Sequence, residues 1–547
     1  MKNYKKVYAA FILAGGLILH GCNGIFDDLA INPNQPSMGA YFTSPSAVND
    51  AVMTMYGYMS TQRCLGASGS KTTIIRSDEA SSNSDYGKPG MFGADLNASY
   101  YTIEQPYTLM YTTASQASYI IETAPSVDFS GNEELRNAYM GEAYFWRAFA
   151  HYYLLINFRN ISPIRQMPRN GDDYVRPLEK PAAVWNFIQE DLAHAKELLP
   201  VKGYWDSKNA GRVTKASAAA LLGKAYLYRS GIEQYYGEDK TTFYSEAAKE
   251  FGDVIDGKYG TYDLTKNYAD NFDVAHENNE ESILEFQFLG DVDNAGFNPG
   301  LATSGLAFDS RGLMLPGAGV GYEGVVHNWL YNAFVNSVDK DGYTDIRMFS
   351  TMIFNDLDAS IHLRNDAGGN LVRLEGPGGY KWEELYPAKN GKEGFATVSN
   401  PLAHSFKAGI RKGIDCSMPT QTEADGTPKL VGVGAGVKEY VYNQPRAHGV
   451  NWRYIRYADV LMMYAEAVVS GGTQASNMTP LQAVNKVRGR VNMSELPSVT
   501  MTDIPNFKKF ISADDFKGFV TNKHEWLPIP INEVNSNPYI TENNPGY

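Results

Sequence analysis

Apolar residues recur every three or four positions in eight windows of the chain, a spacing that places them on one face of an α-helix. Six windows follow one another in the N-terminal half and two lie far downstream, at residues 48–59, 110–121, 135–156, 184–199, 218–228, 247–255, 460–468 and 481–491. Ser44 and Pro45 precede the first window and Thr479 and Pro480 precede the last, as at helix N-termini. The pattern therefore predicts eight amphipathic helices.

These windows fall into four consecutive pairs. Each helix pair leaves an apolar face that only a neighbouring pair can cover, which is the physical basis of tetratricopeptide-type helical repeats. The repeats are degenerate and interrupted by insertions. We predict a mainly α fold, with four helix pairs at about 45–257 and 454–491 inside one body spanning 45–547.

The stretch from about 258 to 453 has a different pattern. It is rich in Gly, Pro, Asn and aromatic residues, and it holds short strand-like runs such as 282–288. Long irregular segments on a rigid scaffold often carry binding function. We therefore predict a loop-rich, ligand-binding insertion at 258–453 and a separate C-terminal segment at 492–547.

The first residues follow the layout of a secretory signal. Three lysines precede an almost wholly apolar run at 7–19, which is shorter than the roughly 20 residues that a membrane-spanning helix needs. The run ends in Leu-His-Gly-Cys at 19–22, which resembles the lipobox of a bacterial lipoprotein except for the histidine. We expect a signal peptide at 1–21 and a lipid on Cys22, followed by a tethering arm at 22–44. The alternative is an ordinary signal peptide with an incidental cysteine.

The net charge of −13 argues against nucleic acid and anionic lipid as partners. Besides Cys22 only Cys64 and Cys416 are present, too few for a disulfide framework. The sequence leaves open whether these two pair or are buried thiols.

Several segments resemble the SusD/RagB family of Bacteroidetes outer-membrane nutrient-binding lipoproteins. The most diagnostic is Ile-Arg-Tyr-Ala-Asp-Val-Leu-Met-Met-Tyr-Ala-Glu-Ala at 455–467, followed by Val-Arg-Gly-Arg at 487–490. The C-terminal Leu-Pro-Ile-Pro at 527–530 and Asn-Pro-Gly-Tyr at 544–547 also match, in the family's order. Further similar segments lie at 142–149, 211–228 and 280–288. One departure concerns a helical segment that members carry before the Leu-Pro-Ile-Pro strand, of which 507–519 is the only candidate remnant.

The resemblance implies a role. Family members are outer-membrane, cell-surface lipoproteins that bind oligosaccharides, or peptides in some lineages, and that cover a SusC-like TonB-dependent transporter. The helical repeats mainly face the transporter, and the irregular half supplies ligand contacts. A peptide-binding member is the first alternative, and a surface glycan hydrolase or a scaffold without a nutrient ligand is a further one.

The sequence shows no motif of nucleophilic, zinc-dependent or nucleotide-dependent catalysis. Asp339, Asp341 and Asp345 faintly resemble a calcium loop, but the terminal Glu at the required spacing is missing. A solvated turn before Arg347 is the preferred interpretation. We therefore predict no catalytic residue, no metal and no cofactor.

A neutral sugar is bound by exposed aromatic rings with hydrogen-bonding side chains nearby. Six aromatic residues in or near polar, glycine-rich segments meet this description: Tyr86, Tyr101, Tyr322, Trp329, Tyr380 and Trp382. Each has a competing interpretation as a core residue. Apolar neighbours make helix core as plausible for Trp329, Tyr101 could pack on the second helix, and Trp382 stands in a more polar setting.

Overall fold

The computed structural model describes most of the chain. The described residues are 42–69, 76–82, 96–169, 173, 175–236, 240–288, 308–309, 324–376, 379–398, 401–412, 430–432, 438–440, 447–503, 523 and 525–547. The predicted signal peptide, Cys22, Tyr86, Tyr322, Cys416 and the segment 507–519 all lie outside them. Cys64 is a buried free thiol.

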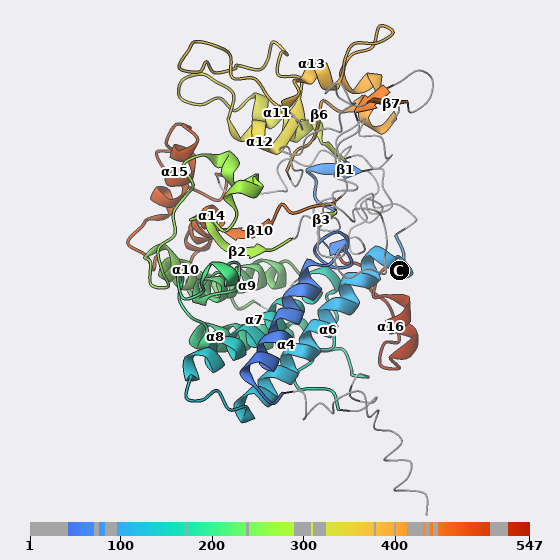
Figure 1. Ribbon diagram of the computed structural model, residues 1–547, viewed down its shortest axis with the longest axis vertical. Coiled ribbons are helices and arrows are strands. Elements are labelled where there is room, and N and C mark those ends of the chain that lie inside the picture. The colour runs from blue at the N-terminus through green and yellow to red at the C-terminus, as the bar shows by residue number, and fades with distance from the viewer. Residues whose placement is uncertain are drawn as a thin grey trace, which may run out of the picture.

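All eight predicted helices are present, and the first six form the lower layer of the molecule (Figure 1). Six follow one another, each packed against its neighbour: α4 (Pro45–Ser60), α6 (Tyr101–Thr123), α7 (Glu133–Phe158), α8 (Pro181–Leu198), α9 (Lys215–Tyr236) and α10 (Tyr244–Ile255). After a long excursion the chain returns through α14 (Tyr457–Val469) and α15 (Pro480–Arg490), with α14 against α10. The mainly α, repeat-type fold is therefore confirmed.

Local chemistry explains the helix boundaries. The Ser44 side chain accepts a hydrogen bond from the backbone N–H of Ala47 at the start of α4. Thr479 and Gln482 form a capping box at α15, with Pro480 at its first position. These groups satisfy backbone N–H donors that a helix leaves free at its N-terminus.

Buried ion pairs connect the helices of this layer. Arg147 of α7 bonds Asp191 of α8 at 2.7 Å. Arg159, which follows α7, bonds Glu233 of α9 at 2.8 Å. Such pairs fix which helices face one another, because removing one partner leaves an uncompensated buried charge.

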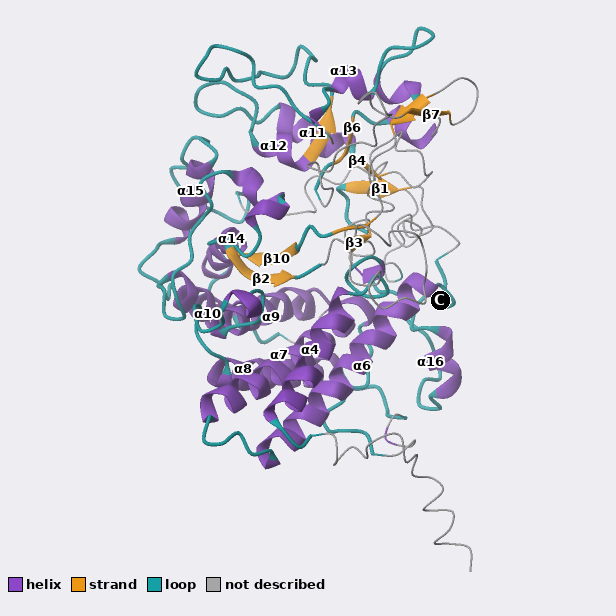
Figure 2. Ribbon diagram, viewed as in Figure 1, coloured by secondary structure: helices purple, strands orange, loops and turns teal. Residues whose placement is uncertain are grey.

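The loop-rich half carries short strands above the helices (Figure 2). Its largest sheet has the order β1-β4-β6-β5, all antiparallel, from Ala80–Ser82, Gly324–Val326, Ala408–Ile410 and Met352–Phe354. The two-stranded ladders β3–β9 (Phe308–Asp309, Ala447–His448) and β7–β8 (Leu430–Gly432, Lys438–Tyr440) add to it. Short helices complete this half: α11 (Asn328–Val335), α12 (Arg347–Thr351) and α13 (Trp382–Leu385). α16 (Ile531–Ser536) lies beside α6.

The antiparallel pair β2–β10 lies between the two halves, from Ser282–Phe286 and Trp452–Arg456. β2 confirms the strand predicted within 282–288. One continuous apolar core runs from the helices through this pair into the four-stranded sheet. The strand β1 belongs to the connection between α4 and α6, so the N-terminal part of the chain also enters the upper half. In the part of the chain that the structure describes, no helix combines the length and apolar character required to cross a membrane.

Candidate functional site

A cavity of about 510 Å³ opens where the helices meet the upper half. This volume lies within the roughly 300–1,000 Å³ typical of small-molecule sites. Its walls come from α9, β10 and α14 on the helical side, and from β1, β4, β6 and the segment at Asn271 and Phe272 on the other. The resemblance implies ligand contacts from the irregular half, which remains a prediction, and this cavity is lined from both halves.

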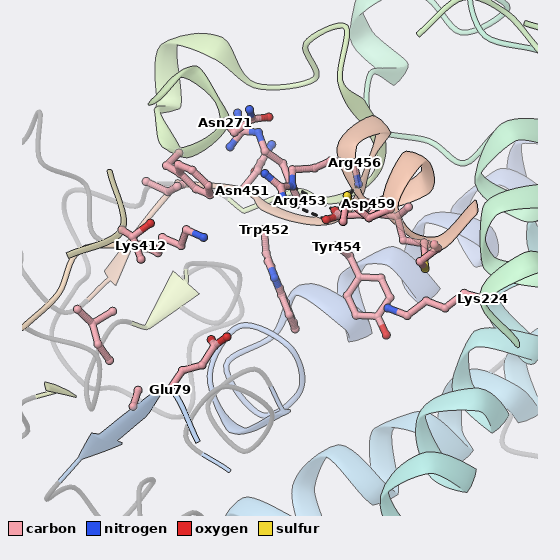
Figure 3. A pocket seen from close by; sticks show the side chains of 18 of the residues that line it. Glu79, Lys224, Asn271, Lys412, Asn451, Trp452, Arg453, Tyr454, Arg456 and Asp459 are labelled. Carbon is pink, nitrogen blue, oxygen red and sulfur yellow. Dashed lines mark hydrogen bonds and ion pairs between the residues drawn. The ribbon is translucent and has the colours of Figure 1, made fainter. Parts of the chain in front are cut away.

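The strand β10 places two aromatic side chains in the cavity (Figure 3). Successive residues of a strand point to opposite faces, so Trp452 and Tyr454 project to one side while Arg453 is buried on the other. The two rings meet edge to face, with centroids 5.4 Å apart. Both rest against Phe286 of β2, and both are only half-buried. The result is a partly exposed aromatic surface on a rigid support.

The buried face of β10 is held by hydrogen bonds. Arg453 donates to the carbonyl of His276 at 2.9 Å. Asn451 donates from its backbone to Glu277 at 2.8 Å and from its side chain to Glu285 at 2.9 Å. Burial raises the pKa of Glu277 to about 7, with Glu285 nearby adding to the effect and the Asn451 bond opposing it. These contacts fix the strand that carries the aromatic pair.

The junction between β10 and α14 is an ion pair that is also a helix cap. Arg456 and Asp459 bond at 2.9 Å, and the Asp459 side chain accepts the backbone N–H of Arg456. Burial alone would raise the pKa of Asp459, but Arg456 holds it below the usual value. Asp459 is therefore ionised, and its carboxylate already bonds Arg456.

Two lysines reach the cavity from different elements. Lys224 of α9 lies 4.5 Å from the centroid of the Tyr454 ring and 5.5 Å from that of Tyr228. Lys412, just after β6, lies 4.8 Å from the centroid of Phe272. Burial would lower the pKa of Lys224, but the Tyr454 and Tyr228 hydroxyls and Asp459 raise it above its usual value. Lys224 is thus charged near neutral pH.

Two carboxylates also line the cavity, Glu79 beside β1 and Glu466 on α14. Burial raises the pKa of both, and Lys412 partly offsets this effect at Glu79. Aromatic faces, amines, carboxyls and the Asn271 amide therefore converge on one space. This combination suits a ligand with apolar C–H faces and many hydroxyl groups.

The four described residues among the six predicted aromatic ones do not line this cavity. Trp329 is half-buried, and its indole N–H donates to the carbonyl of Asp78 at 2.6 Å. Tyr101 is 41% exposed at the start of α6, stacked on Tyr100. Tyr380 is half-buried in the upper half. None of the described ones lines the cavity, and their ligand contacts remain a prediction.

The prediction that Trp382 lies in a polar setting is wrong. Its side chain is only 8% exposed, with ring centroids 4.5 Å from Tyr386 and 5.1 Å from Phe395. Tyr386 follows the same short helix and Phe395 comes from a later turn of the chain, so the polar residues next to Trp382 in sequence do not describe its environment. The ring serves the core of the upper half.

The acidic turn before Arg347 is also more buried than expected. Asp345 is fully buried and pairs with Arg347 at 2.6 Å, and Asp339 pairs with Arg364. Among the described residues, no group of His, Cys, Asp or Glu side chains is arranged to hold a metal ion.

Sequence reasoning missed Trp452, Tyr454 and Lys224. The Trp-Arg-Tyr-Ile-Arg run at 452–456 alternates in the manner of a strand, and it could have indicated two aromatic side chains on one face. No local pattern points to Lys224, because its partner Tyr454 lies far along the chain.

Comparisons with known proteins agree with this architecture. Residues 31–227 match a family described as starch-binding and associating with the outer membrane, and residues 431–522 match the SusD family. A SusD-like protein of Bacteroides ovatus is 23% identical, covering 92% of this chain and 80% of its own length. SusD-like protein P2 of Formosa agariphila is 24% identical, with both chains fully covered.

Solved structures share the fold. A SusD superfamily protein of Bacteroides vulgatus superposes with a TM-score of 0.66 at 19% identity, covering 93% of this chain and all of the other. Surface glycan-binding protein A of Bacteroides thetaiotaomicron, in complex with laminarihexaose, gives 0.63 at 15% identity, with 92% and full coverage. A laminarin-binding SusD-like protein gives 0.62 at 20% identity, again with 92% and full coverage.

Fold and site together define an α-helical repeat protein with a cavity between its helices and a loop-rich upper half. The chain belongs to the SusD/RagB family, a family of glycan-binding proteins.

Proposed function

We propose that this protein is a cell-surface lipoprotein that binds oligosaccharides in the cavity beside β10 and delivers them to a SusC-like TonB-dependent transporter of the outer membrane. The observation that carries the binding proposal is the half-exposed pair Trp452 and Tyr454, set among hydrogen-bonding side chains in a cavity of about 510 Å³.

The chemistry of the cavity supports a sugar ligand. An aromatic ring takes the C–H face of a pyranose by dispersion and excludes water from it. Lys224, Asn271 and Glu79 stand around this surface and can exchange hydrogen bonds with hydroxyl groups. Structural neighbours that bind laminarin or laminarihexaose add weight to the proposal.

The signal-like N-terminus supports the lipid anchor in this proposal. Membership of the family supports the transporter partner and the loop-rich half as a ligand-binding region. A transport partner is tested by affinity purification from outer membranes with a tag on this protein. We expect a β-barrel transporter to co-purify. Recovery of the tagged protein alone, under conditions that retain known membrane complexes, would contradict delivery to a transporter.

Trp452→Ala tests the binding site. We expect calorimetric titration with a panel of oligosaccharides to show about tenfold or greater loss of affinity, because a central aromatic contact is worth roughly 2 kcal/mol or more. Trp452→Phe should keep much of the affinity. The matched control is Tyr539→Ala, which removes an aromatic side chain that is 57% exposed and outside the cavity.

The outcomes separate the candidate functions. Unchanged affinity in folded Trp452→Ala would place the sugar elsewhere. Retention of peptides with no retention of any oligosaccharide would favour the peptide-binding alternative. Release of shortened sugars by the purified protein would show that it is a hydrolase.

A further inference from the structure

The two lysines of the cavity differ from the other cations around it. Arg456 is paired with Asp459 at 2.9 Å, and behind the wall Arg490 is bonded to Glu281. Lys224 and Lys412 contact aromatic rings instead. Among the residues that the structure describes, no carboxylate oxygen lies within 4.0 Å of either amine.

Lys224 is the better placed of the two for a ligand. Its ammonium group lies over the Tyr454 ring, which forms the aromatic surface together with Trp452. Asp459 is the carboxylate that raises the pKa of Lys224. It already bonds Arg456 through both of its carboxylate oxygens. Lys412, by contrast, has Glu79 as an electrostatic neighbour. Lys224 is therefore a cation whose charge no local acid neutralises.

The arginines of the wall are already paired with acids. The Nε atom of Arg453 lies 3.6 Å from a carboxylate oxygen of Glu285, and the Nη1 atom of Arg456 lies 4.0 Å from one of Glu281. Glu79 and Glu466 are the remaining acids of the lining, and neither bonds Lys224. Among the cations of the described lining, Lys224 therefore has neither a bonded acid nor Glu79 as an electrostatic neighbour.

We propose that the cavity selects oligosaccharides with acidic sugar units, and that Lys224 determines this specificity by pairing with the carboxylate or sulfate of a sugar that stacks on Trp452. The proposal rests on the proposed function and narrows its substrate class. The geometry suits it because an acidic group extends from the edge of a sugar ring. The edge of a sugar on Trp452 lies beside Tyr454, whose ring carries the Lys224 ammonium.

The test compares Lys224→Gln with wild type in calorimetric titrations against three probes. These are an oligogalacturonide with carboxylates, a carrageenan-derived oligosaccharide with sulfates, and neutral laminarihexaose. A charge-assisted hydrogen bond in a shielded site contributes roughly tenfold to hundredfold in affinity. We expect a loss of this size for the acidic probe that binds, about twofold or less for the neutral probe, and recovery in Lys224→Arg.

Two controls isolate the role of Lys224. Lys208→Gln removes an exposed lysine that is not part of the cavity lining and should change no affinity. Raising the salt concentration should weaken binding of the acidic probe in wild type and much less in Lys224→Gln, because ion pairs are screened. Circular dichroism and thermal unfolding confirm that each variant is folded.

Each result has one meaning. Binding of the carboxylated or the sulfated probe, lost in Lys224→Gln, supports the proposal and identifies the acidic group. Tighter binding of laminarihexaose, or equal losses for acidic and neutral probes, would overturn it while sugar binding stands. Binding of an acidic peptide and of no sugar would overturn both this proposal and the proposed function.

Discussion

At the scale of single residues, burial decides which polar groups are free to act. His151 of α7 is fully buried, and both nitrogens of its ring have hydrogen-bond partners. Nδ1 lies 2.7 Å from the Arg147 carbonyl, and Nε2 accepts the backbone N–H of Ile164 at 2.9 Å. Because Nε2 accepts, this network assigns the proton to Nδ1 and requires a neutral ring. Burial, the largest cause, lowers the pKa of His151 from 6.5 to about 3.

This lowered pKa predicts a loss of stability in acid. The unfolded chain takes up a proton at His151 as the pH falls through 6.5, whereas the folded protein does so only near 3. The contribution of His151 is therefore fully present above pH 6.5 and lost progressively below it, with a slope of at most about 1.4 kcal/mol per pH unit.

Urea unfolding at pH 7, 6 and 5 checks this prediction by comparing wild type with His151→Gln. The variant starts less stable, and we expect the gap between the two to shrink as the pH falls. Glu277 titrates in the same range in both proteins, so its effect cancels in the difference. Parallel pH profiles would show that His151 is not the group responsible.

At the scale of elements, close helix contacts oppose helix propensity. Gly141 lies inside α7, where an added Cβ would be 2.9 Å from the backbone nitrogen of Leu199 at the end of α8. Gly57 lies inside α4, and an added Cβ there would meet nothing within 4 Å. The same substitution should therefore act in opposite directions at the two sites.

We predict that Gly141→Ala lowers the free energy of unfolding by about 1–3 kcal/mol, because backbone atoms cannot move aside cheaply. Its matched control, Gly57→Ala, should raise this free energy by about 0.5–1 kcal/mol through helix propensity and a less flexible unfolded chain. Denaturant titration of both variants measures the difference. A gain at both positions would mean that α7 and α8 are less closely packed than the structure indicates.

At the scale of the whole molecule, we predict that attachment to the membrane and ligand binding are separate. The cavity belongs to a body whose core is continuous, whereas the proposed lipid attachment is at Cys22, at the start of the arm 22–44. That arm is a candidate for one side of a hinge that lets the body open and close over a transporter.

We predict that Cys22→Ala abolishes lipid attachment and cell-surface retention, and leaves the oligosaccharide affinity of the purified protein unchanged. Globomycin-sensitive processing, surface labelling of whole cells and calorimetry measure the three properties. Trp452→Ala is the converse control, since it should lose affinity and keep surface retention. Normal surface retention of Cys22→Ala would show that another segment holds the protein at the membrane.

The sequence by itself determined the features that depend only on residues close together in the chain. Helical periodicity and caps such as Thr479 are local, so eight helices and the strand β2 could be predicted with their order. Motifs such as 455–467 indicated the family for the same reason.

Only the tertiary structure decided where the candidate site lies. Glu79, Lys224 and Trp452 come from three distant parts of the chain, and they meet because β1 enters the upper half while α9 packs beneath β10. Burial is likewise a property of the assembled fold. It placed Trp382 in the core despite its polar neighbours and left Trp452 partly exposed, because the partners of each ring come from elsewhere in the chain.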